Sequence, residues 1–445
     1  MKKQKINIIT LGCSKNLVDS EQLATQLKGS NLQVEFDSNN SNARSIVINT
    51  CGFIKDSKEE SIDTILNYAQ AKALGKIDNL FVIGCLAERY KKDLQKEITE
   101  VDQFFGVNDL QQIVKSLKAN YKEELLGERS ISTPKHFAYL KISEGCDRTC
   151  SFCAIPLIRG KYQSVPIELL VKQAQSLAEI GVKEIILIAQ DLVSYGQDLY
   201  KENKLAELLK QLIKIEKIKW IRLHYTYPTG FPDEVIELMA TEEKICKYID
   251  IPLQHINDKV LKLMRRGHNR KSTFKLISKL RERIPDIIIR TTLLIGHPGE
   301  GQEEFEELKE FVKEVKFDRL GVFTYSEEEG TYGAKNLKDE IPQETKDERS
   351  DEIMAIQQEI SLSLNQNKIG KNYNILIDRI EGDYYVGRSE FDSPEVDNEI
   401  LVPVLNNQLN IGDFYQVKIE DAKEYDLYGQ LTPKIHGIFA IKDSD

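Results

Sequence analysis

The sequence predicts an α/β protein in three parts: an N-terminal parallel α/β domain over residues 4–120, an incomplete (β/α)6 barrel over 132–370, and a small all-β, OB-like barrel over 371–440. Two observations predict this fold class. Short apolar runs alternate with helical patterns through the first two parts, as in parallel sheets covered by helices. Beyond residue 370, short alternating strands separated by turn residues replace them, which is typical of a small barrel.

The N-terminal part contains short apolar runs of the kind that form buried parallel strands. Strands are predicted at Ile6–Leu11, Ser45–Asn49 and Leu80–Ile83. Helical patterns at Asp19–Lys28 and Lys55–Ala73 separate them, and a further helix follows the third strand. We expect the stretch Tyr121–Pro134 to link this domain to the next.

In the second part, strand and helix patterns alternate six times. The predicted strands are Phe137–Ile142, Glu184–Ala189, Trp220–Tyr225, Tyr248–Leu253, Ile287–Ile295 and Arg319–Tyr325. The predicted helices are Pro166–Ile180, Lys204–Glu216, Asp233–Thr241, Asp258–Met264, Lys271–Arg283 and Glu303–Lys316. Six units suit an incomplete parallel barrel, because eight such units make the closed form. Functional groups of such barrels lie at the C-terminal ends of the strands.

A polar helical pattern over Pro342–Lys368 leads into the third part. Strands are predicted there at Tyr373–Ile377, Tyr384–Phe391, Glu399–Val404 and Phe414–Ile419. Residues 371–445 hold 7 Lys and Arg against 15 Asp and Glu, a balance of −8, with six acidic residues from Asp383 to Glu399. A barrel that binds nucleic acid needs a positive groove. The charge therefore favours docking of a basic protein, with a merely solvated acidic face as the alternative.

The whole chain of 445 residues has a net charge of −10. It has no apolar run of about 18 residues, which excludes a spanning helix. The N-terminus lacks the apolar stretch and cleavage site of a signal peptide, so we expect a cytoplasmic protein without membrane contact. Seven cysteines are too few for a disulfide scaffold and would stay reduced there. Cysteines that cluster in such a chain indicate a metal site or catalysis.

Cys146, Cys150 and Cys153 form a C-x3-C-x2-C motif directly after the first predicted barrel strand. Three thiolates on one short loop can hold three irons of a 4Fe–4S cluster, whereas full ligation takes four cysteines. The fourth iron would then stay open for a substrate group, just as catalytic zinc sites keep one position free. The alternatives are a zinc site, which needs a fourth ligand, and reduced structural thiols.

Cys13, Cys51 and Cys85 each come two residues after a predicted N-terminal strand. Parallel strands bring them to the same edge of the sheet, where open α/β sheets bind ligands. Neighbouring strands lie about 4.7–4.9 Å apart, so the three thiols can converge on one cluster. A glycine beside each cysteine lets the backbone approach closely: Gly12, Gly52 and Gly84. The alternative is three buried core cysteines.

Two sets of three cysteines, followed by a small β domain, resemble the radical S-adenosylmethionine (SAM) methylthiotransferases. The resemblance covers essentially the whole chain: an N-terminal cluster domain (4–120), a radical SAM barrel (132–370) and a TRAM domain (371–440). Within the family, the chain is similar to the branch that modifies a ribosomal protein. The stretches that carry this similarity are Lys141–Cys146, Arg222–Tyr225, Ile251–His255, Met264–Gly267 and Gly387–Asp392.

The resemblance implies a transferase of sulfur-containing groups, with two 4Fe–4S clusters and SAM as cofactors. It implies insertion of a methylthio group at the β-carbon of an aspartate in the small-subunit ribosomal protein of the decoding centre, giving 3-methylthioaspartate. The substrate is that basic protein, free or in the small ribosomal subunit. We expect a flavodoxin or ferredoxin to supply electrons, a further compound to supply sulfur, and the enzyme to act as a monomer.

Two other functions stay open. One keeps the chemistry but modifies an adenosine in tRNA. The other is a non-catalytic iron–sulfur scaffold or electron carrier. That function predicts four cysteines per cluster, whereas the six cysteines here form two sets of three.

Four further residues are predicted to contact SAM. Gln190 and Asp191 end the second barrel strand, where Asp191 alternatively caps a helix. Gly296 and Gly299 follow the fifth strand, where they let the adenine or ribose approach the backbone.

Other polar residues lie near the predicted barrel strands. Arg222, His224 and His255 either line the cavity or are paired, because unpaired charged groups are rarely buried. Arg265 and Arg266 are expected on a solvated helix face, with binding of a carboxylate as the alternative. His297 either packs or contacts a ligand. Cys246 stands alone and is expected to be a core thiol.

Overall fold

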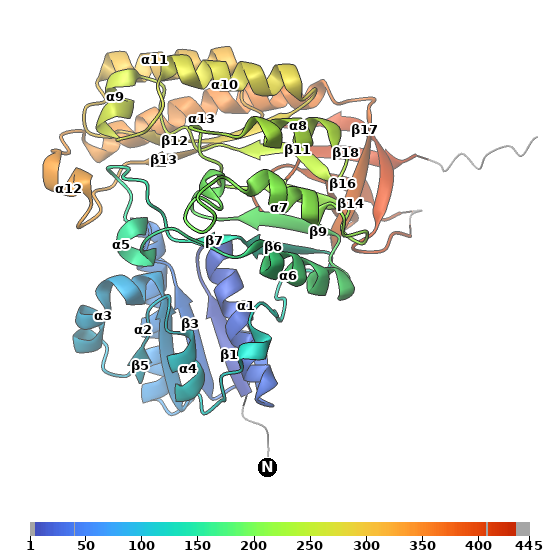
Figure 1. The fold of residues 1–445 in the computed structure, drawn as a ribbon. Helices are drawn as coiled ribbons and strands as arrows, with labels where there is room; N and C mark the ends of the chain where they lie inside the picture. Colours follow the sequence, from blue (N-terminus) through green and yellow to red (C-terminus); the bar gives the residue numbers. More distant parts are fainter. Residues whose placement is uncertain (1–4, 40, 406–407, 433–445) are drawn as a thin grey trace, which may run out of the picture. The chain divides into compact units, whose positions relative to one another are not determined.

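The computed structural model describes residues 5–39, 41–405 and 408–432. The chain divides into two compact units between Ile356 and Gln357. The first unit contains two parallel sheets covered by helices, and the second contains a closed β-barrel (Figure 1). The predicted α/β fold class, with a small all-β barrel at its C-terminal end, is confirmed.

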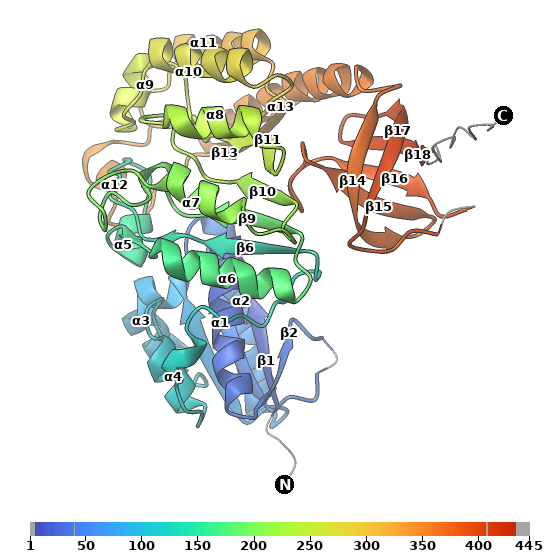
Figure 2. The ribbon, with the colours of Figure 1, turned by 45° about the vertical axis from the view of Figure 1, so that its right-hand side comes forward.

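The first sheet has five parallel strands in the order β2-β1-β3-β4-β5. Figure 2 shows its edge strand β2 beside β1. They are β1 (Lys5–Thr10), β2 (Gln33–Phe36), β3 (Ser45–Thr50), β4 (Asn79–Gly84) and β5 (Gln103–Phe104). The helices are α1 (Ser14–Gly29), α2 (Lys55–Ala73), α3 (Cys85–Glu97) and α4 (Leu110–Ser116). Ile46 and Ile48 pack against α2 and α3, whereas Val47 packs against α1 and α4. Strand alternation thus buries both faces of the sheet.

Several elements of this part of the chain differ from the prediction, and helix α4 has no predicted counterpart. Helix α1 begins at Ser14, five residues before the predicted start at Asp19. The prediction misses its first turn, because that turn buries the polar Lys15 and Asn16 and shows no apolar periodicity. The sequence does not predict β2, which is a mostly half-exposed edge strand, or β5, which has two residues.

The second sheet has six parallel strands in chain order and is not closed, which confirms the incomplete (β/α)6 barrel. Its strands are β6 (Phe137–Lys141), β9 (Glu184–Ile188), β10 (Trp220–Leu223), β11 (Ile245–Asp250), β12 (Ile288–Ile295) and β13 (Arg319–Thr324). The helices between them are α6 (Ile167–Glu179), α7 (Leu205–Leu212), α8 (Asp233–Thr241), α9 (Asp258–Leu263), α10 (Arg270–Arg283) and α11 (Gln302–Val315).

Strand β11 is displaced from its predicted position. It begins at Ile245, three residues before the predicted start, and ends before Pro252, which cannot donate to a sheet ladder. Cys246 therefore lies on this strand. Its side chain is completely buried, which confirms the predicted core thiol.

Short elements at one end of this barrel shape the region around the cysteine motif. Strands β7 (Ser143–Glu144) and β8 (Gln163–Ser164) pair as a ribbon, with the motif and helix α5 (Ile155–Arg159) between them. The turn η2 (Leu192–Ser194) follows β9, and helix α12 (Tyr332–Asn336) follows β13. A single turn, η1 (Glu123–Leu125), interrupts the segment between the two sheets.

Helix α13 (Gln343–Gln366) crosses the division between the two units. The second unit is a barrel closed in the order β14-β15-β16-β18-β17, which confirms the OB-like architecture. Its strands are β14 (Asn372–Glu381), β15 (Tyr384–Ser389), β16 (Glu399–Pro403), β17 (Phe414–Ala422) and β18 (Asp426–Leu431). Strand β18 is missing from the prediction. Its Gly429 lies so close to β17 that a Cβ would approach Val417 Cγ1 to 2.4 Å.

The acidic run of this barrel exposes fewer carboxylates than its sequence indicates. Asp392 is 1% exposed and accepts a hydrogen bond from Ser389. Asp397 accepts from the backbone of Ser393 at 2.9 Å, and Glu399 is paired with Arg379 at 2.7 Å. These carboxylates stabilise the connection between β15 and β16, so the acidic surface is smaller than a count of residues predicts.

Among the residues that the structure describes, no helix combines the length and apolarity that a membrane span requires.

Candidate active site

The three N-terminal cysteines follow three neighbouring strands of the first sheet. Cys13 comes after β1 and directly precedes α1, Cys51 follows β3, and Cys85 begins α3 after β4. Because β1, β3 and β4 are adjacent and parallel, the three thiols lie at one edge of the sheet. The structure thus brings together the residues that their spacing predicts.

Glycines at this edge permit close approach, as the sequence indicates. Gly12 has a φ of +86°, and a Cβ there would lie 2.6 Å from Cys51 Cβ. A Cβ on Gly84, with a φ of +97°, would lie 2.3 Å from Asn49 Oδ1. A larger residue at either position would therefore displace the cysteine-bearing strand ends.

Asn16 holds the strand ends of this edge in place. Its side-chain amide donates to the carbonyls of Leu11 at 2.9 Å and Thr50 at 3.1 Å. Its backbone carbonyl accepts from Asn49 at 2.8 Å. One fully buried residue of α1 therefore ties β1 and β3 together beside Cys13 and Cys51.

The second cysteine set lies on the loop after β6, at the C-terminal end of the barrel. Gly145, with a φ of +75°, allows this loop to cross the backbone of Lys161, whose carbonyl oxygen would lie 2.1 Å from a Cβ. In the middle of the loop, the Ser151 amide donates to the carbonyl of Met264 at 2.9 Å, and the Ser151 carbonyl accepts from Gly333 at 2.7 Å. The loop is therefore anchored on both sides by the barrel.

His297 provides a third anchor for the loop. Burial lowers the pKa of His297 to about 4, so the ring is neutral near pH 7. Its Nδ1 lies 3.0 Å from the carbonyl of Pro298 and donates to it, which leaves Nε2 to accept from the Ser151 hydroxyl at 2.8 Å. Its ring also packs edge-on against Phe152 and Tyr325. Of the two predicted roles, packing is the one that the structure shows.

Hydrogen-bond donors approach the sulfur atoms of both sets. The Arg148 amide lies 3.4 Å from Cys146 Sγ, and the Arg266 guanidinium lies 3.5 Å from Cys150 Sγ. In the other set, Arg159 Nε lies 3.4 Å from Cys85 Sγ. Hydrogen-bond donors at sulfur stabilise thiolates and the iron clusters that thiolates bind.

Burial raises the pKa of several thiols, to about 12 for Cys85 and Cys153 and about 11 for Cys146. The charges of neighbouring cysteines raise these pKa values further, which shows that members of each set lie within electrostatic reach of one another. Buried thiols become thiolates when a metal replaces the proton.

The donor set fits a polynuclear cluster better than a single ion. Within the described part of the chain, no three His, Cys, Asp or Glu side chains lie close enough together to hold one metal ion. A 4Fe–4S cluster binds each cysteine at a different iron, so its ligands do not converge on one point. The grouped thiols, of which Cys51, Cys85 and Cys146 are buried, and the donors close to their sulfurs therefore suit an iron–sulfur cluster.

Arg159 connects the two cysteine sets. Its side chain is 1% exposed, and its Nη2 donates to Asn16 Oδ1 at 2.6 Å, at the edge that carries the N-terminal cysteines. Its Nη1 donates to Glu144 at 2.9 Å, two residues before Cys146. With the contact to Cys85, one guanidinium thus reaches both cysteine-bearing segments.

Further charges surround Arg159. Asp19 of α1 accepts from Nη1 at 3.1 Å and is also paired with Lys141 at the end of β6. Lys141 donates to Glu144 at 2.6 Å. Lys141 and Arg159, with burial opposing them, lower the pKa of Glu144 to about 2, so its carboxylate is ionised. Two cations and two carboxylates thus form a partly buried network between the sheets, with Arg159 as its fully buried member.

A second link between the sheets lies at Glu328, which is 4% exposed. Lys58 of α2 donates to it at 2.9 Å and Arg89 of α3 at 2.5 Å. Each ion pair joins a helix of the first sheet to the loop after β13.

Two of the four predicted SAM contacts, Gln190 and Asp191, lie near the cluster loop, but each also has a structural partner. Gln190 donates to Glu144 at 2.8 Å, whereas its Oε1 is buried without a partner among the described residues. Asp191 caps η2 through the Val193 amide and pairs with Arg148 at 2.7 Å. The capping alternative is therefore present, and a role in SAM binding stays a prediction.

Gly296 and Gly299 both have positive φ, +74° and +95°. A Cβ on Gly296 would lie 2.3 Å from Lys346 Cγ, and one on Gly299 would lie 2.3 Å from Leu263 Cδ1. Protein side chains thus approach these glycines in the structure, and an approach by SAM stays a prediction.

The polar residues on the barrel strands are largely paired. Arg222 forms an ion pair with Glu184 at 2.8 Å in which both side chains are completely buried. His255 Nε2 lies 3.5 Å from Glu300, which also binds Arg349 at 2.8 Å. His224 is buried beside the Tyr225 and Tyr248 rings. Of the two predicted roles, pairing is the one that the structure shows for Arg222. His255 Nε2 is buried without a hydrogen-bond partner among the described residues, so a role in lining the cavity stays a prediction for His255.

Arg265 and Arg266 do not lie on a solvated helix face. They follow the end of α9, and Arg265 has a positive φ of 57°. The Arg266 guanidinium donates to the carbonyl of Pro252 at 2.5 Å and lies 4.2 Å from the Tyr227 ring. The expectation is wrong for Arg266, because the chain turns at Arg265 and directs Arg266 toward the cluster loop, whereas Arg265 is exposed.

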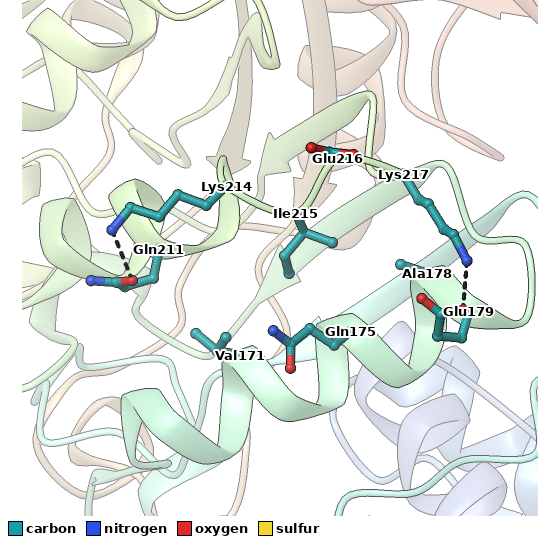
Figure 3. A pocket seen from close by; sticks show the side chains of 9 residues that line it. All are labelled: Val171, Gln175, Ala178, Glu179, Gln211, Lys214, Ile215, Glu216 and Lys217. Carbon is teal, nitrogen blue, oxygen red and sulfur yellow. Dashed lines mark hydrogen bonds and ion pairs between the residues drawn. The ribbon is translucent and has the colours of Figure 1, made fainter.

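A pocket of about 380 Å³ opens beside the cluster loop. It is lined by Cys146, Cys150, Cys153, Arg265 and Tyr332, among others. A larger pocket, of about 530 Å³, lies between α6 and α7 (Figure 3). Lys217 pairs there with Glu179, and Lys214 donates to Gln211. No cysteine or histidine lines the larger pocket, so the pocket at the cluster loop is the one that suits cofactor chemistry.

Sequence reasoning missed Asn16, Asp19, Glu144, Arg148 and Arg159 as site residues. Asn16, Asp19, Glu144 and Arg148 lie within a few positions of a cysteine in the sequence. Arg159 ends helix α5, which begins shortly after Cys153. Proximity in the sequence is the available signal, but only the packing of two sheets shows that these residues meet.

An open parallel barrel with a three-cysteine loop at the C-terminal end of its first strand defines a radical SAM protein. The model of the Radical SAM superfamily matches residues 140–312. The model described as uncharacterized protein family UPF0004 matches residues 5–106, and the TRAM domain model matches residues 369–432.

The chain belongs to the family of ribosomal protein uS12 methylthiotransferases called RimO. It is 56% identical over 430 residues to the relative of Christiangramia forsetii, with 97% of this chain and 95% of that protein covered. It is 57% identical over 430 residues to the relative of Flavobacterium psychrophilum, covering 97% and 98%. With the relative of Bacteroides thetaiotaomicron it shares 53% identity over 434 residues, covering 98% and 100%.

Solved structures show a similar fold. The radical SAM methyltransferase TsrM of Kitasatospora setae, with tryptophan and a SAM analogue bound, matches with a TM-score of 0.53 at 13% identity. The match covers 72% of this chain and 73% of that chain. At this identity, the likeness concerns the fold alone.

Proposed function

We propose that this protein is a radical SAM methylthiotransferase that modifies ribosomal protein uS12. One observation carries the proposal: two sets of three cysteines lie on facing segments of one compact unit, joined by Arg159. The RimO relatives, which are named for this activity, align with nearly the full length of the chain. They do not favour modification of a tRNA adenosine.

The cluster loop is the site for the first 4Fe–4S cluster, held by Cys146, Cys150 and Cys153. When bound, this cluster leaves one iron for SAM and supplies the electron that cleaves SAM to a carbon radical able to abstract hydrogen from an unactivated C–H bond. The pocket beside the loop gives SAM access. Gln190 is a candidate SAM contact, because its Oε1 is a buried acceptor without a partner among the described residues.

Cys13, Cys51 and Cys85 hold a second 4Fe–4S cluster in this proposal. The arrangement that supports it is the placement of three thiols at one sheet edge, with Asn16 and Arg159 hydrogen-bonded around them. This cluster provides or carries the inserted sulfur, and a second SAM provides the methyl group.

The target in this proposal is an aspartate of uS12, whose β-carbon receives the methylthio group. A flavodoxin or ferredoxin delivers electrons, a separate compound replenishes sulfur, and the enzyme works as a cytoplasmic monomer. The acidic residues that stay exposed on the second unit, such as Asp383 and Glu395, are suited to a basic ribosomal protein. Binding should therefore weaken as salt rises.

The test uses anaerobically reconstituted full-length protein with SAM, sulfide and a reductant. We expect purified uS12 to gain the mass of one methylthio group, and tRNA treated in parallel to gain none. Omission of the reductant should abolish the gain. Modification of tRNA with uS12 left unchanged would contradict the proposal.

A further inference from the structure

Lys15 is a buried cation that the proposed chemistry does not use. Its side chain belongs to the first turn of α1, two residues after Cys13, and the residue is 7% exposed. Its Nζ lies 3.3 Å from the centroid of the Tyr225 ring. Within residues 5–39, 41–405 and 408–432, it forms no hydrogen bond or ion pair. A buried ammonium ordinarily has an anionic partner.

The stability of α1 does not account for a lysine at this position. The first turn of a helix favours negative charge, because its unpaired N–H groups carry partial positive charge. Here the first turn contains no acidic residue and holds a cation instead. The neighbouring Ser14 Oγ is also buried without a hydrogen-bond partner in the described part of the chain. Two adjacent polar groups thus remain unsatisfied at this helix terminus.

The position of Lys15 relates it to both cysteine sets. On one side it is close in sequence to Cys13. On the other, Tyr225 follows β10 at the C-terminal end of the barrel, and its carbonyl accepts from Leu192 at 3.1 Å. Asp191, the residue before Leu192, binds Arg148 of the cluster loop. Lys15 therefore lies between the edge that carries the N-terminal cysteines and the barrel end where the cluster loop lies.

We propose that Lys15 binds the carboxylate of the substrate aspartate and so makes the enzyme selective for an acidic side chain. This inference rests on the proposed function, in which the modified carbon must reach both cysteine sets. Lys15 lies between these two sets. An ammonium pairs with a carboxylate through a charge-assisted hydrogen bond. The Tyr225 ring holds the ammonium by a cation–π contact until substrate arrives.

The test is a double-mutant cycle between Lys15 and the target carboxylate. The variant Lys15→Met keeps the apolar stem and removes the charge. The partner is uS12 whose modified aspartate, located by mass spectrometry of the wild-type product, is replaced by asparagine. Dissociation constants are measured for the four combinations with reconstituted full-length enzyme and SAM.

Wild-type enzyme should bind the aspartate form about ten- to a hundredfold more tightly than the asparagine form. The Lys15→Met enzyme should bind the two forms equally. The matched control is Lys28→Met, which removes an exposed lysine of the same helix that also lies over an aromatic ring, Phe36. This control should discriminate as the wild type does.

Because the result is a ratio within one variant, a general loss of stability or of uS12 affinity cancels. If Lys15→Met fails to bind iron, Lys15→Gln provides the same comparison with a polar, uncharged side chain. Discrimination retained by an iron-loaded Lys15 variant would overturn the inference, and so would a wild-type enzyme that binds both forms equally. The proposed function fails separately, when wild-type enzyme leaves uS12 unmodified.

Discussion

Arg159 Nε lies 3.4 Å from the sulfur of Cys85, although the two residues belong to different sheets and are separated by 74 positions in the chain. The same guanidinium contacts Glu144, at the base of the cluster loop. One buried side chain therefore fixes the N-terminal thiol edge relative to the loop that holds the radical SAM motif.

The variant Arg159→Met should lower the reduction potential of the N-terminal cluster, because hydrogen bonds to cluster sulfurs and nearby positive charge favour the reduced form. It should also lower the free energy of unfolding by about 1–3 kcal/mol, since Asn16, Asp19 and Glu144 lose a buried donor. A redox titration followed by electron paramagnetic resonance measures the first effect. Arg44→Met removes an exposed ion pair and should change neither quantity measurably. An unchanged potential would show that Arg159 is structural only.

Replacement of Cys146, Cys150 and Cys153 together by alanine should remove one cluster and abolish SAM cleavage. Iron should fall from about eight to about four atoms per chain, because three cysteines hold each 4Fe–4S cluster. Colorimetric iron and sulfide assays and chromatography of 5′-deoxyadenosine check this. The control is Cys246→Ala, which removes a core thiol on β11 and should keep both clusters. Formation of 5′-deoxyadenosine by the triple variant would remove the loop from the mechanism.

The opposite triple variant, with alanine at Cys13, Cys51 and Cys85, should still cleave SAM but form no methylthio product. The reason is the division of labour in the proposal, in which this cluster handles sulfur and the loop cluster generates the radical. Mass spectrometry of uS12 and measurement of 5′-deoxyadenosine in the same reaction separate the two steps. A methylthio product from this variant would show that sulfur reaches the substrate by another route.

Arg222→Met should destabilise the protein without changing its cofactor content. Removing one partner leaves Glu184 as a charge in a completely buried site, which costs about 3–5 kcal/mol in the free energy of unfolding. The double variant with Glu184→Leu should recover most of that loss, because an apolar pair of similar volume replaces the ion pair. Urea unfolding measures both. Weaker SAM binding by the stable double variant would instead indicate that Arg222 lines the cofactor site.

The sequence by itself determined the two sheets, the small barrel and both cysteine sets. Parallel strands buried on both faces are continuous apolar runs, so β1, β3, β4 and five of the six barrel strands could be located closely. The cysteines could be assigned because each lies at a strand end, and parallel strands place such positions at one edge. Strand β11 was displaced, and β2, β5, β7, β8 and β18 escaped prediction, since short or half-exposed strands lack that apolar signal.

Only the tertiary structure decided which polar residues meet. No pattern in the sequence indicates a role for Arg159, and Arg266 is predicted on a solvated helix face. In the fold, each guanidinium lies beside a cysteine sulfur. The isolation of Lys15 is equally invisible in the sequence, because a missing partner is a property of the whole packed surroundings. Ion pairs between distant segments have no periodicity, so packing of the two sheets alone determines the charges that surround these thiols.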